Sequence, residues 1–187
     1  MVERLLEYER NMFYVINGTH TWWLDRLMLL FSSFWIWFPL LLVPAYFLWK
    51  RHGEWLRMTV CTLLSVACNL MITDMVFKPL FKRFRPTSHP CFMEHVRKVH
   101  DYLAQGDFGF ISGHTTNAYA FAMLSTLAVK NKWYSISIFL WATWMAYSRI
   151  YLGAHFITDV VPGIILGILS GWGAYYIYIQ KNKLPLQ

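Results

Sequence analysis

Apolar residues along this chain gather into five long runs that are separated by polar connections. A helix needs about 20 predominantly apolar residues to cross the hydrocarbon core of a bilayer. Tryptophan and tyrosine stand near the ends of several runs, as they do at membrane–water interfaces. The runs cover residues 27–49, 55–77, 110–129, 133–147 or a little beyond, and 156–179. The pattern predicts an all-α fold, an integral membrane helical bundle with about five transmembrane helices.

The first 18 residues show a different pattern. Apolar side chains recur there at helical spacing, with charged side chains between them. The apolar positions are Leu5, Tyr8, Met12 and Val15. This arrangement predicts an amphipathic helix that lies in the membrane interface. The segment lacks the basic start and the small-residue cleavage site of a secretory signal peptide. A sixth span in this segment stays an open alternative.

We therefore expect a single membrane-embedded domain over residues 1–187. It comprises an interfacial helix (1–20), a transmembrane bundle (21–179) and a cytoplasmic tail (180–187). The composition agrees, since 57% of the residues are hydrophobic and 14% are charged, whereas soluble domains are about a quarter charged. The composition argues against a water-soluble domain.

Basic residues assign the two sides of the membrane. Under a five-span count, one side carries the first connection, the third connection and the tail. Their cations are Lys50, Arg51, Arg57, Lys130, Lys132, Lys181 and Lys183. The positive-inside rule makes that side cytoplasmic. We expect a multi-pass protein of the inner (cytoplasmic) membrane, with the second and fourth connections facing the periplasm or the cell exterior.

The second connection, residues 78–109, is basic as well, which the charge rule does not explain. It opens with the stretch KPLFKRFRP, which runs from Lys78 to Arg85 and Pro86. Arginine offers a planar fork of donors that matches phosphate oxygens, and lysine adds a compact charge. The stretch therefore indicates an anion-binding role for Lys78 and Arg85. The alternative is a basic patch that touches anionic lipid.

A Ser-Gly-His triplet, residues 112–114, stands where the third run begins. Helix N-termini bind phosphate readily, because their N–H groups are unpaired and carry a partial positive charge. Ser112 can cap the helix or donate to a ligand oxygen. Gly113 permits a close approach to the backbone, and His114 can carry a proton near neutral pH. The alternative is an ordinary cap followed by an interfacial histidine.

A third polar group lies between the fourth and fifth runs. Ser148 and Arg149 end the fourth run, and Gly153 marks a turn. His155 and Asp159 then begin the fifth run, and their i, i+4 spacing places them on one helix face. A carboxylate there can hold one imidazole nitrogen and leave the other nucleophilic. The alternative is a pair that only fixes helix packing, but a buried aspartate in a membrane is costly enough to favour function.

Together the three groups resemble the type 2 phosphatidic-acid phosphatase family, which is related to glucose-6-phosphatase and vanadium haloperoxidases. The family pattern is Lys, six residues, Arg-Pro; then Pro-Ser-Gly-His; then Ser-Arg, five residues, His, three residues, Asp. The first and third groups are complete here, at residues 78–86 and 148–159, while Ile111 replaces the proline of the second. The resemblance covers roughly residues 55–175.

The resemblance implies a metal-independent, two-step hydrolysis of a phosphate ester that needs no cofactor. His155 would attack phosphorus and form a phosphohistidine, and Asp159 would orient its imidazole. His114 would protonate the leaving oxygen and then activate water. The groups that would hold the phosphoryl oxygens are Lys78, Arg85, Ser112, Gly113 and Arg149. The sequence shows no cluster of carboxylates of the kind that holds magnesium.

The site residues fall at the ends of apolar runs, so we expect a lipid phosphate and the bilayer as partners, and no nucleic acid. The resemblance to short bacterial members places undecaprenyl diphosphate first among substrates. Lipid A phosphates, phosphatidylglycerol phosphate and phosphatidic acid stay open, as does the oligomeric state. Two other classes are a haloperoxidase, which the five apolar runs disfavour, and a transporter, which Asn69 and Asp74 inside the second run suggest.

Other features indicate structure rather than chemistry. Gly163, Gly167 and Gly171 repeat every four residues, and such a stripe lets two helices approach closely. We expect this stripe to pack within the chain. The three cysteines predict no disulfide framework. Cys91 and the histidines near it match no zinc spacing, so no metal site is expected there.

Overall fold

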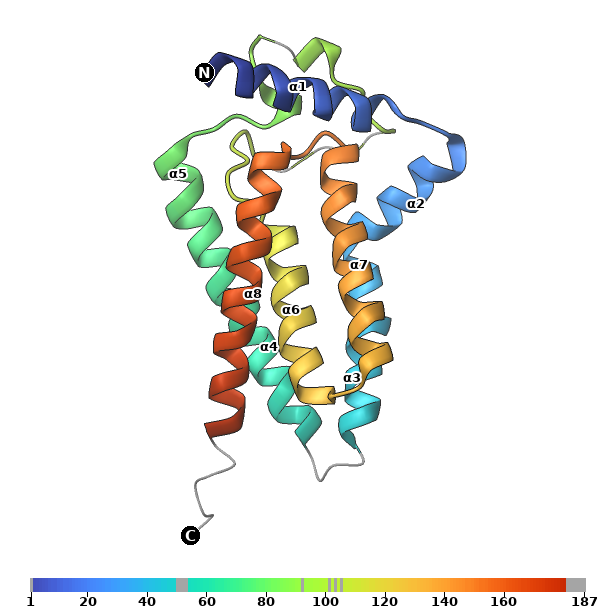
Figure 1. Ribbon diagram of the computed structural model, residues 1–187, viewed down its shortest axis with the longest axis vertical. Helices are drawn as coiled ribbons and strands as arrows, with labels where there is room; N and C mark the ends of the chain where they lie inside the picture. The colour runs from blue at the N-terminus through green and yellow to red at the C-terminus, as the bar shows by residue number, and fades with distance from the viewer. Residues whose placement is uncertain are drawn as a thin grey trace.

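The computed structural model describes residues 2–49, 54–91, 93–100, 102, 104 and 106–180, and over these residues the chain forms helices and no strand. The helices are α1 (Val2–Gly18), α2 (Trp22–Ser32), α3 (Trp37–Trp49), α4 (Glu54–Leu70), α5 (Lys78–Phe81), α6 (Gly113–Val129), α7 (Lys132–Tyr151) and α8 (Ile157–Gln180). Short 3-10 turns are η1 (Phe34–Ile36), η3 (Pro86–Ser88) and η4 (Met93–His95), and η2 (Met71–Phe77) is a π-helix. This arrangement confirms the all-α expectation (Figure 1).

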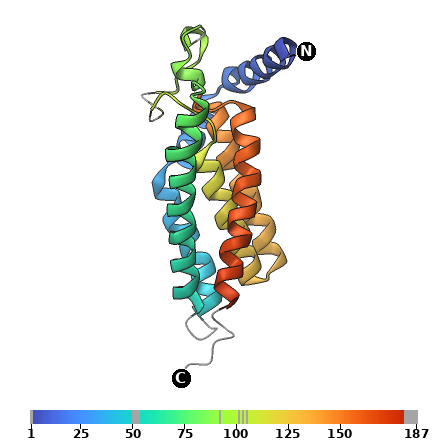
Figure 2. The same cartoon turned by 90° about the vertical axis from the view of Figure 1, so that its left-hand side faces the viewer.

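The long helices run side by side, and α6 lies at the centre of the bundle. Nearly every side chain of α6 is buried, because α4, α7 and α8 surround it. The segment from Glu54 to Phe81 forms one continuous rod in which η2, a stretch of π-helix, joins α4 to α5 (Figure 2). π-helical stretches inside longer helices often mark functional sites. Here η2 leads directly into α5, whose first residue is Lys78.

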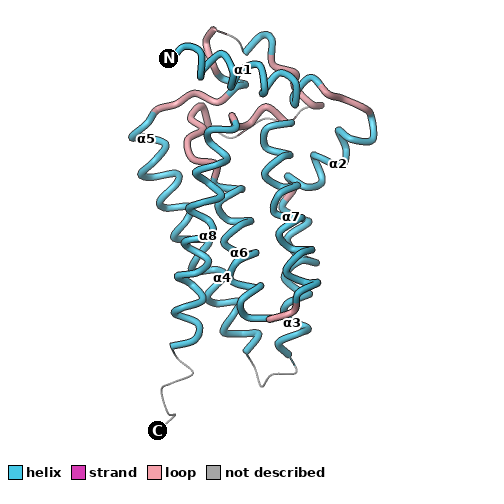
Figure 3. The backbone as a smooth tube through the Cα atoms, in the orientation of Figure 1, coloured by secondary structure: helices cyan, strands magenta, loops and turns pink. Residues whose placement is uncertain are grey.

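Helix α1 lies across one end of the bundle, above α7 and α8 (Figure 3). Its buried side chains are Phe13 and Asn17. The Asn17 amide donates to the Tyr151 carbonyl at 2.8 Å, and its oxygen accepts from the Arg97 N–H at 2.8 Å. The stripe of Tyr8, Met12 and Val15 remains exposed. The predicted amphipathic helix is therefore present, and its free apolar stripe points away from the bundle.

The outer surface of the bundle is strongly apolar. The helical segments Glu54–Phe81 and Ile157–Gln180 are long and apolar enough to cross a membrane, and Pro39–Trp49 is a shorter apolar helix. Large apolar side chains on these segments are exposed, among them Leu63, Met75, Ile165, Leu169 and Trp172. Such a surface is stable in lipid rather than in water.

One predicted span was expected to be a single helix, and this expectation is wrong. The run over residues 27–49 forms α2 and α3, separated by an extended Ser33 and the turn η1. Proline lacks an N–H and suits the first turn of a helix, and membrane helices also tolerate it in their interior, as α3 does at Pro44. Pro39 accordingly stands in the first turn of α3. The other four runs correspond to helices whose ends shift by a few residues.

The glycine stripe packs α8 against α6 inside the chain, as predicted. A Cβ atom added at Gly167 would lie 2.4 Å from the Thr116 carbonyl oxygen. At Gly171 it would lie 2.3 Å from the carbonyl oxygen of Ala120. Both distances are shorter than side chains tolerate, so only glycine allows this approach of the two backbones. The stripe thereby fixes α8 beside the residues that open α6.

The cations used to assign sidedness are only partly described. Arg57 lies in the first turn of α4, Lys130 follows α6 and Lys132 begins α7, at the end of the bundle opposite to α1. The other cations, Lys50, Arg51, Lys181 and Lys183, lie outside the described residues, as does the tail from residue 181 onward.

Candidate active site

A cavity of about 710 Å³ joins most of the predicted site residues. Six of the eight line it, from α5, the loop after it, α6, α7 and the turn before α8: Lys78, Arg85, Gly113, His114, Arg149 and His155. The remaining two, Ser112 and Asp159, are fully buried beside it. Further wall residues continue from this polar end along α3 and α4: Trp37, Leu41, Leu63, Val66 and Leu70. The cavity therefore connects a group of cations and histidines with an apolar wall that is partly open to the outer surface of the bundle.

The loop after α5 aims two arginines at the start of α8. The Arg85 N–H donates to the Asp107 carbonyl at 2.8 Å, and the Gly109 N–H donates to the Arg83 carbonyl at 2.8 Å. Phe84 and Phe108 form an antiparallel bridge between these bonds. In extended backbone, residues i and i+2 point to the same side. Arg83 and Arg85 consequently reach neighbouring parts of the same site, while Phe84 points away.

Arg85 contacts His155 directly. Its Nη1 lies 2.9 Å from His155 Nε2 and donates to the Ala154 carbonyl at 3.0 Å. A guanidinium group can only donate, so Nε2 accepts and the imidazole proton is assigned to Nδ1. Burial, followed by the charge of Arg85, holds the pKa of His155 well below its ordinary value. The arrangement thus presents a neutral imidazole whose Nε2 lone pair faces a cation.

Asp159 lies beside His155, but their relation differs from the predicted helical pair. His155 precedes α8, which begins at Ile157, so the i, i+4 geometry of a helix does not apply to it. The distance from Asp159 Oδ2 to His155 Nδ1 is 3.7 Å, longer than a hydrogen bond. The same oxygen accepts from the Phe156 N–H at 2.9 Å. An acidic side chain in the first turn that reaches back to the N-terminal N–H in this way also stabilises the helix end.

Arg83 is the closest cationic partner of Asp159, and the sequence did not single it out. Its Nη1 donates to Asp159 Oδ1 at 2.6 Å, and its Nη2 donates to Glu9 Oε2 of α1 at 2.7 Å. In the sequence, Arg83 stands among several loop cations with nothing to separate it from them. The one available signal was its i, i+2 relation to Arg85, which has meaning only once the loop is known to be extended.

The remaining cations of the cavity come from α5 and α7. Lys78 Nζ lies 2.5 Å from Asp74 Oδ1, which places Asp74 both in an ion pair and on the cavity wall. The buried Arg149 donates to the hydroxyl of Ser32, and its guanidinium lies 5.5 Å from the centre of the Tyr102 ring. Arg149 Nε has no hydrogen-bond partner among the described residues. Ser32 and Tyr102 line the cavity and were not predicted.

The Ser-Gly-His triplet begins α6, with its three residues in different roles. The imidazole of His114 is accessible from the cavity. A Cβ at Gly113 would lie 3.2 Å from Thr73 Oγ1, so the glycine lets η2 pack closely. The Ser112 hydroxyl lies 3.0 Å from the Thr115 hydroxyl. The backbone N–H of Ser112 donates to the Asp159 carbonyl at 3.1 Å. Ser112 occupies the N-cap position without a side-chain cap bond and does not line the cavity.

Residues 54–183 match the PAP2 superfamily. The chain is 39% identical over 184 residues to a lipid A 4'-phosphatase of Porphyromonas gingivalis. The alignment covers 97% of this chain and 78% of the relative. It is 30% identical over 181 residues to a lipid A 4'-phosphatase of Bacteroides thetaiotaomicron. That alignment covers 95% of this chain and 80% of the relative. The fold is similar to that of a transmembrane PAP2-type phosphatidylglycerolphosphate phosphatase from Bacillus subtilis, with a TM-score of 0.69 and 20% sequence identity. The superposition covers 98% of this chain and 90% of that structure.

The helical bundle described above therefore shares its fold with a membrane phosphatase. The chain belongs to the PAP2 superfamily, and the family indicated by the three sequence motifs is confirmed.

Proposed function

We propose that this PAP2 protein is a lipid phosphate phosphatase that removes the 4'-phosphate of lipid A. The observation that carries the substrate is the similarity to two lipid A 4'-phosphatases along nearly the whole chain. It supports the lipid A alternative rather than undecaprenyl diphosphate, which the sequence placed first. Phosphatidylglycerol phosphate and phosphatidic acid become the lesser alternatives, and a transporter has no support from these relatives.

The cavity supports an amphiphilic substrate. Its polar end offers Lys78, Arg85 and Arg149 to a phosphate group, while Trp37, Leu63 and their neighbours offer an apolar wall to acyl chains. Binding sites of this kind combine apolar walls with a few placed polar groups that fix orientation. A phosphate carried on a lipid fits both ends of the cavity, whereas a small soluble phosphate ester uses only one.

The proposed chemistry begins at His155. Its Nε2 attacks phosphorus and forms an N–P bond, while the bond from phosphorus to the sugar oxygen breaks. Arg85 contacts Nε2 in the free protein, and substrate binding turns its donors to the phosphoryl oxygens before the attack begins. His114 gives a proton to the departing sugar oxygen. Fixed donors aimed at the developing charge lower the barrier without reorganising during the reaction.

The second step returns the enzyme to its starting state. Water attacks the phosphohistidine, His114 takes a proton from that water, and the N–P bond breaks with its electron pair returning to Nε2. Lys78, Arg149 and the Gly113 N–H hold the phosphoryl oxygens throughout. Ser112 is assigned to this group by the family motif, and it acts here by ordering the start of α6 through Thr115. Side-chain cations supply the charge that a metal ion supplies in other phosphatases.

The proposed topology has five spans, formed by α2 with α3, by α4 through α5, and by α6, α7 and α8. Helix α1 lies in the interface on the side of the active site. The cations at the opposite end of the bundle assign that end to the cytoplasm. The active site then opens from the inner membrane to the periplasm, and residues 1–187 act as one membrane-embedded domain.

Phosphate release by the purified protein in detergent tests the proposal. The substrates are lipid A, undecaprenyl diphosphate, phosphatidylglycerol phosphate and phosphatidic acid at matched detergent ratios. His155→Ala is the inactive control, and a parallel set contains excess chelator. We expect the highest kcat/KM with lipid A, undiminished by chelation. A higher kcat/KM with undecaprenyl diphosphate would overturn the substrate, and loss of turnover on chelation would overturn the mechanism.

A further inference from the structure

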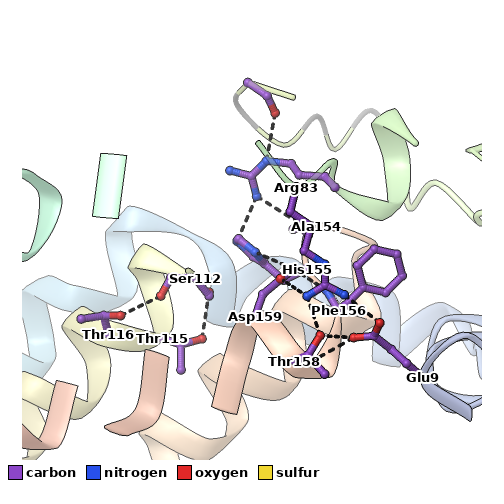
Figure 4. Close-up of polar contacts among 12 residues, drawn as sticks. Glu9, Arg83, Ser112, Thr115, Thr116, Ala154, His155, Phe156, Thr158 and Asp159 are labelled. Atoms are coloured by element: carbon purple, nitrogen blue, oxygen red, sulfur yellow. Dashed lines mark hydrogen bonds and ion pairs between the residues drawn. The ribbon is translucent and has the colours of Figure 1, made fainter. Parts of the chain in front are cut away.

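The ion pair between Arg83 and Asp159 continues outward to the N-terminal helix. Glu9 of α1 accepts from Arg83 Nη2 at 2.7 Å, and its other oxygen accepts from the N–H and hydroxyl of Thr158. Arg83 Nη1 also lies 2.5 Å from Thr158 Oγ1. Glu9 is therefore bonded both to the arginine that holds Asp159 and to the first turn of α8. Figure 4 shows these groups converging beside His155.

Because these charged side chains are buried, losing one of their contacts is expected to cost free energy. The Asp159 side chain is fully buried, and those of Glu9 and Arg83 are 8% and 27% exposed. Removing one partner of a buried charge pair is costly, because the other charge stays buried without compensation. The Arg83 guanidinium also lies 4.9 Å from the centre of the Phe156 ring, which follows His155 directly. Arg83 thus contacts Phe156, Thr158 and Asp159, which all follow the nucleophile within four residues.

Arg83 does not line the cavity, so it has no direct path to a bound phosphate. Its neighbour two positions along, Arg85, occupies that role. The contacts of Arg83 instead constrain the carboxylate and the backbone around His155. Gly109 completes the arrangement, since a Cβ there would lie 3.2 Å from Asp159 Oδ2 and 3.4 Å from His155 Nδ1. The loop therefore encloses the pair tightly and leaves it little freedom to rearrange.

We propose that Arg83 is a positioning residue for the Asp159–His155 pair, and that Glu9 holds Arg83 in place, so that docking of α1 on the bundle sets the geometry of the nucleophile. The inference rests on the proposed function for its role in turnover. It assigns a task to α1 beyond lying at the membrane surface: the helix supplies one carboxylate to the support of the active site.

Enzyme kinetics on lipid A with Arg83→Gln, Arg83→Lys and Glu9→Gln tests this role. A misplaced nucleophile slows the chemical step and leaves substrate binding nearly intact, so Arg83→Gln is expected to lower kcat by about 10- to 100-fold with little change in KM. Arg83→Lys keeps the charge and should restore part of the loss. Glu9→Gln should lower kcat less, and it should add nothing in the Arg83→Gln background, because residues that act through one another are not additive.

Asp25→Asn is the matched control. The Arg97–Asp25 pair spans 2.9 Å, joins the same loop to α2 and is similarly exposed, at 24% and 16%, but it contacts neither Asp159 nor His155. We expect Asp25→Asn to keep the wild-type kcat even where it lowers thermal stability. Equal losses of kcat in Asp25→Asn and Arg83→Gln would show a general effect of loop ion pairs and overturn the proposal, as would wild-type kcat in Arg83→Gln.

Binding of inorganic vanadate, measured by vanadium NMR, separates this inference from the proposed function. Vanadate resembles phosphorus in its five-coordinate state and needs only a correctly placed His155 and the cavity cations. We expect Arg83→Gln to bind it at least about tenfold more weakly than wild type and Asp25→Asn to bind it normally. If the wild-type protein binds vanadate and hydrolyses no lipid phosphate, the proposed function fails and this comparison still decides the role of Arg83. If wild type binds no vanadate, the inference falls as well.

Discussion

At the scale of single residues, His155 and Asp159 have separable tasks. His155 Nε2 faces the cavity and Arg85, whereas Asp159 is fully buried and bonded to Arg83 and the Phe156 N–H. We expect His155→Ala to abolish phosphate release, because no other side chain takes the place of the nucleophile. Asp159→Asn should retain measurable turnover, since it orients rather than attacks. Substantial turnover by folded His155→Ala, verified by its elution profile in detergent, would refute the nucleophile.

The pH profile depends on the same histidine. A free imidazole has a pKa of about 6.5, and burial together with Arg85 lowers the pKa of His155 well below its ordinary value. The nucleophile is neutral above its pKa and loses its lone pair to a proton below it. Activity governed by His155 should therefore persist as the pH falls through 6.5 and decline only at lower pH.

A measurement of kcat/KM from pH 4.5 to 8 checks this prediction, because that ratio reports ionisation of the free enzyme. Arg85→Gln removes a nearby cation and should move the acid limb of whatever activity remains to higher pH. An acid limb centred at or above pH 6.5 in the wild-type enzyme would show that His155 is not held in its neutral form.

At the scale of secondary-structure elements, the contact between α6 and α8 supports the site, because α6 begins with Gly113 and His114 and α8 follows His155. Gly167→Ala puts a methyl group 2.4 Å from the Thr116 carbonyl, which forces the helices apart. Overpacking of this kind costs about 1–3 kcal/mol. Thermal unfolding in detergent should show a lower midpoint for this variant.

Gly173→Ala is the control for the glycine contact. It lies on the same helix, and a Cβ there would meet nothing within 4 Å. Alanine at an open helical position is favoured over glycine by up to about 1 kcal/mol, so this variant should match or exceed wild-type stability. An equal loss of stability in both variants would mean that any methyl group added to α8 lowers stability, and that the close approach to α6 is not the cause.

Periodic and spaced features of the sequence predicted much of the elements and of the site. Four of the five apolar runs correspond to helices, and three motifs gather six cavity residues from segments far apart. The break between α2 and α3 was missed because Pro39 is compatible with a membrane helix as well as with a first turn. Apolar composition alone does not distinguish the two.

The role of Arg83 was missed for a different reason. Its two carboxylate partners, Glu9 and Asp159, lie 74 and 76 residues away along the chain. Contacts at such separations follow from how α1 docks on the bundle and how the loop pairs with residues 107–109. Neither the docking of α1 nor the pairing of the loop can be predicted from a local sequence pattern. The spacing of His155 and Asp159 was informative about their proximity but wrong about its geometry, because the helix begins after His155.

At the scale of the whole molecule, the proposed orientation in the membrane rests on the cations at the end of the bundle opposite to α1. Cys91 is exposed in the loop on the active-site side, while Cys61 is buried. A membrane-impermeant maleimide should label Cys91 in cells whose outer membrane has been permeabilised. The variants Cys91→Ser and Cys68→Ser identify the labelled residue, since Cys68 is also exposed on α4. Labelling of Cys91 only after the inner membrane is opened would reverse the proposed orientation.

The central claim is that this PAP2 site removes the 4'-phosphate of lipid A. Mass spectrometry of the product tests it most directly, because fragmentation across the disaccharide reveals which phosphate has left. Purified wild-type protein and His155→Ala are incubated with bisphosphorylated lipid A in detergent. The account predicts a monophosphorylated product that retains the 1-phosphate, formed by wild type and absent with His155→Ala. A product that retains the 4'-phosphate, or lipid A left unchanged by an enzyme that hydrolyses another lipid phosphate, would contradict it.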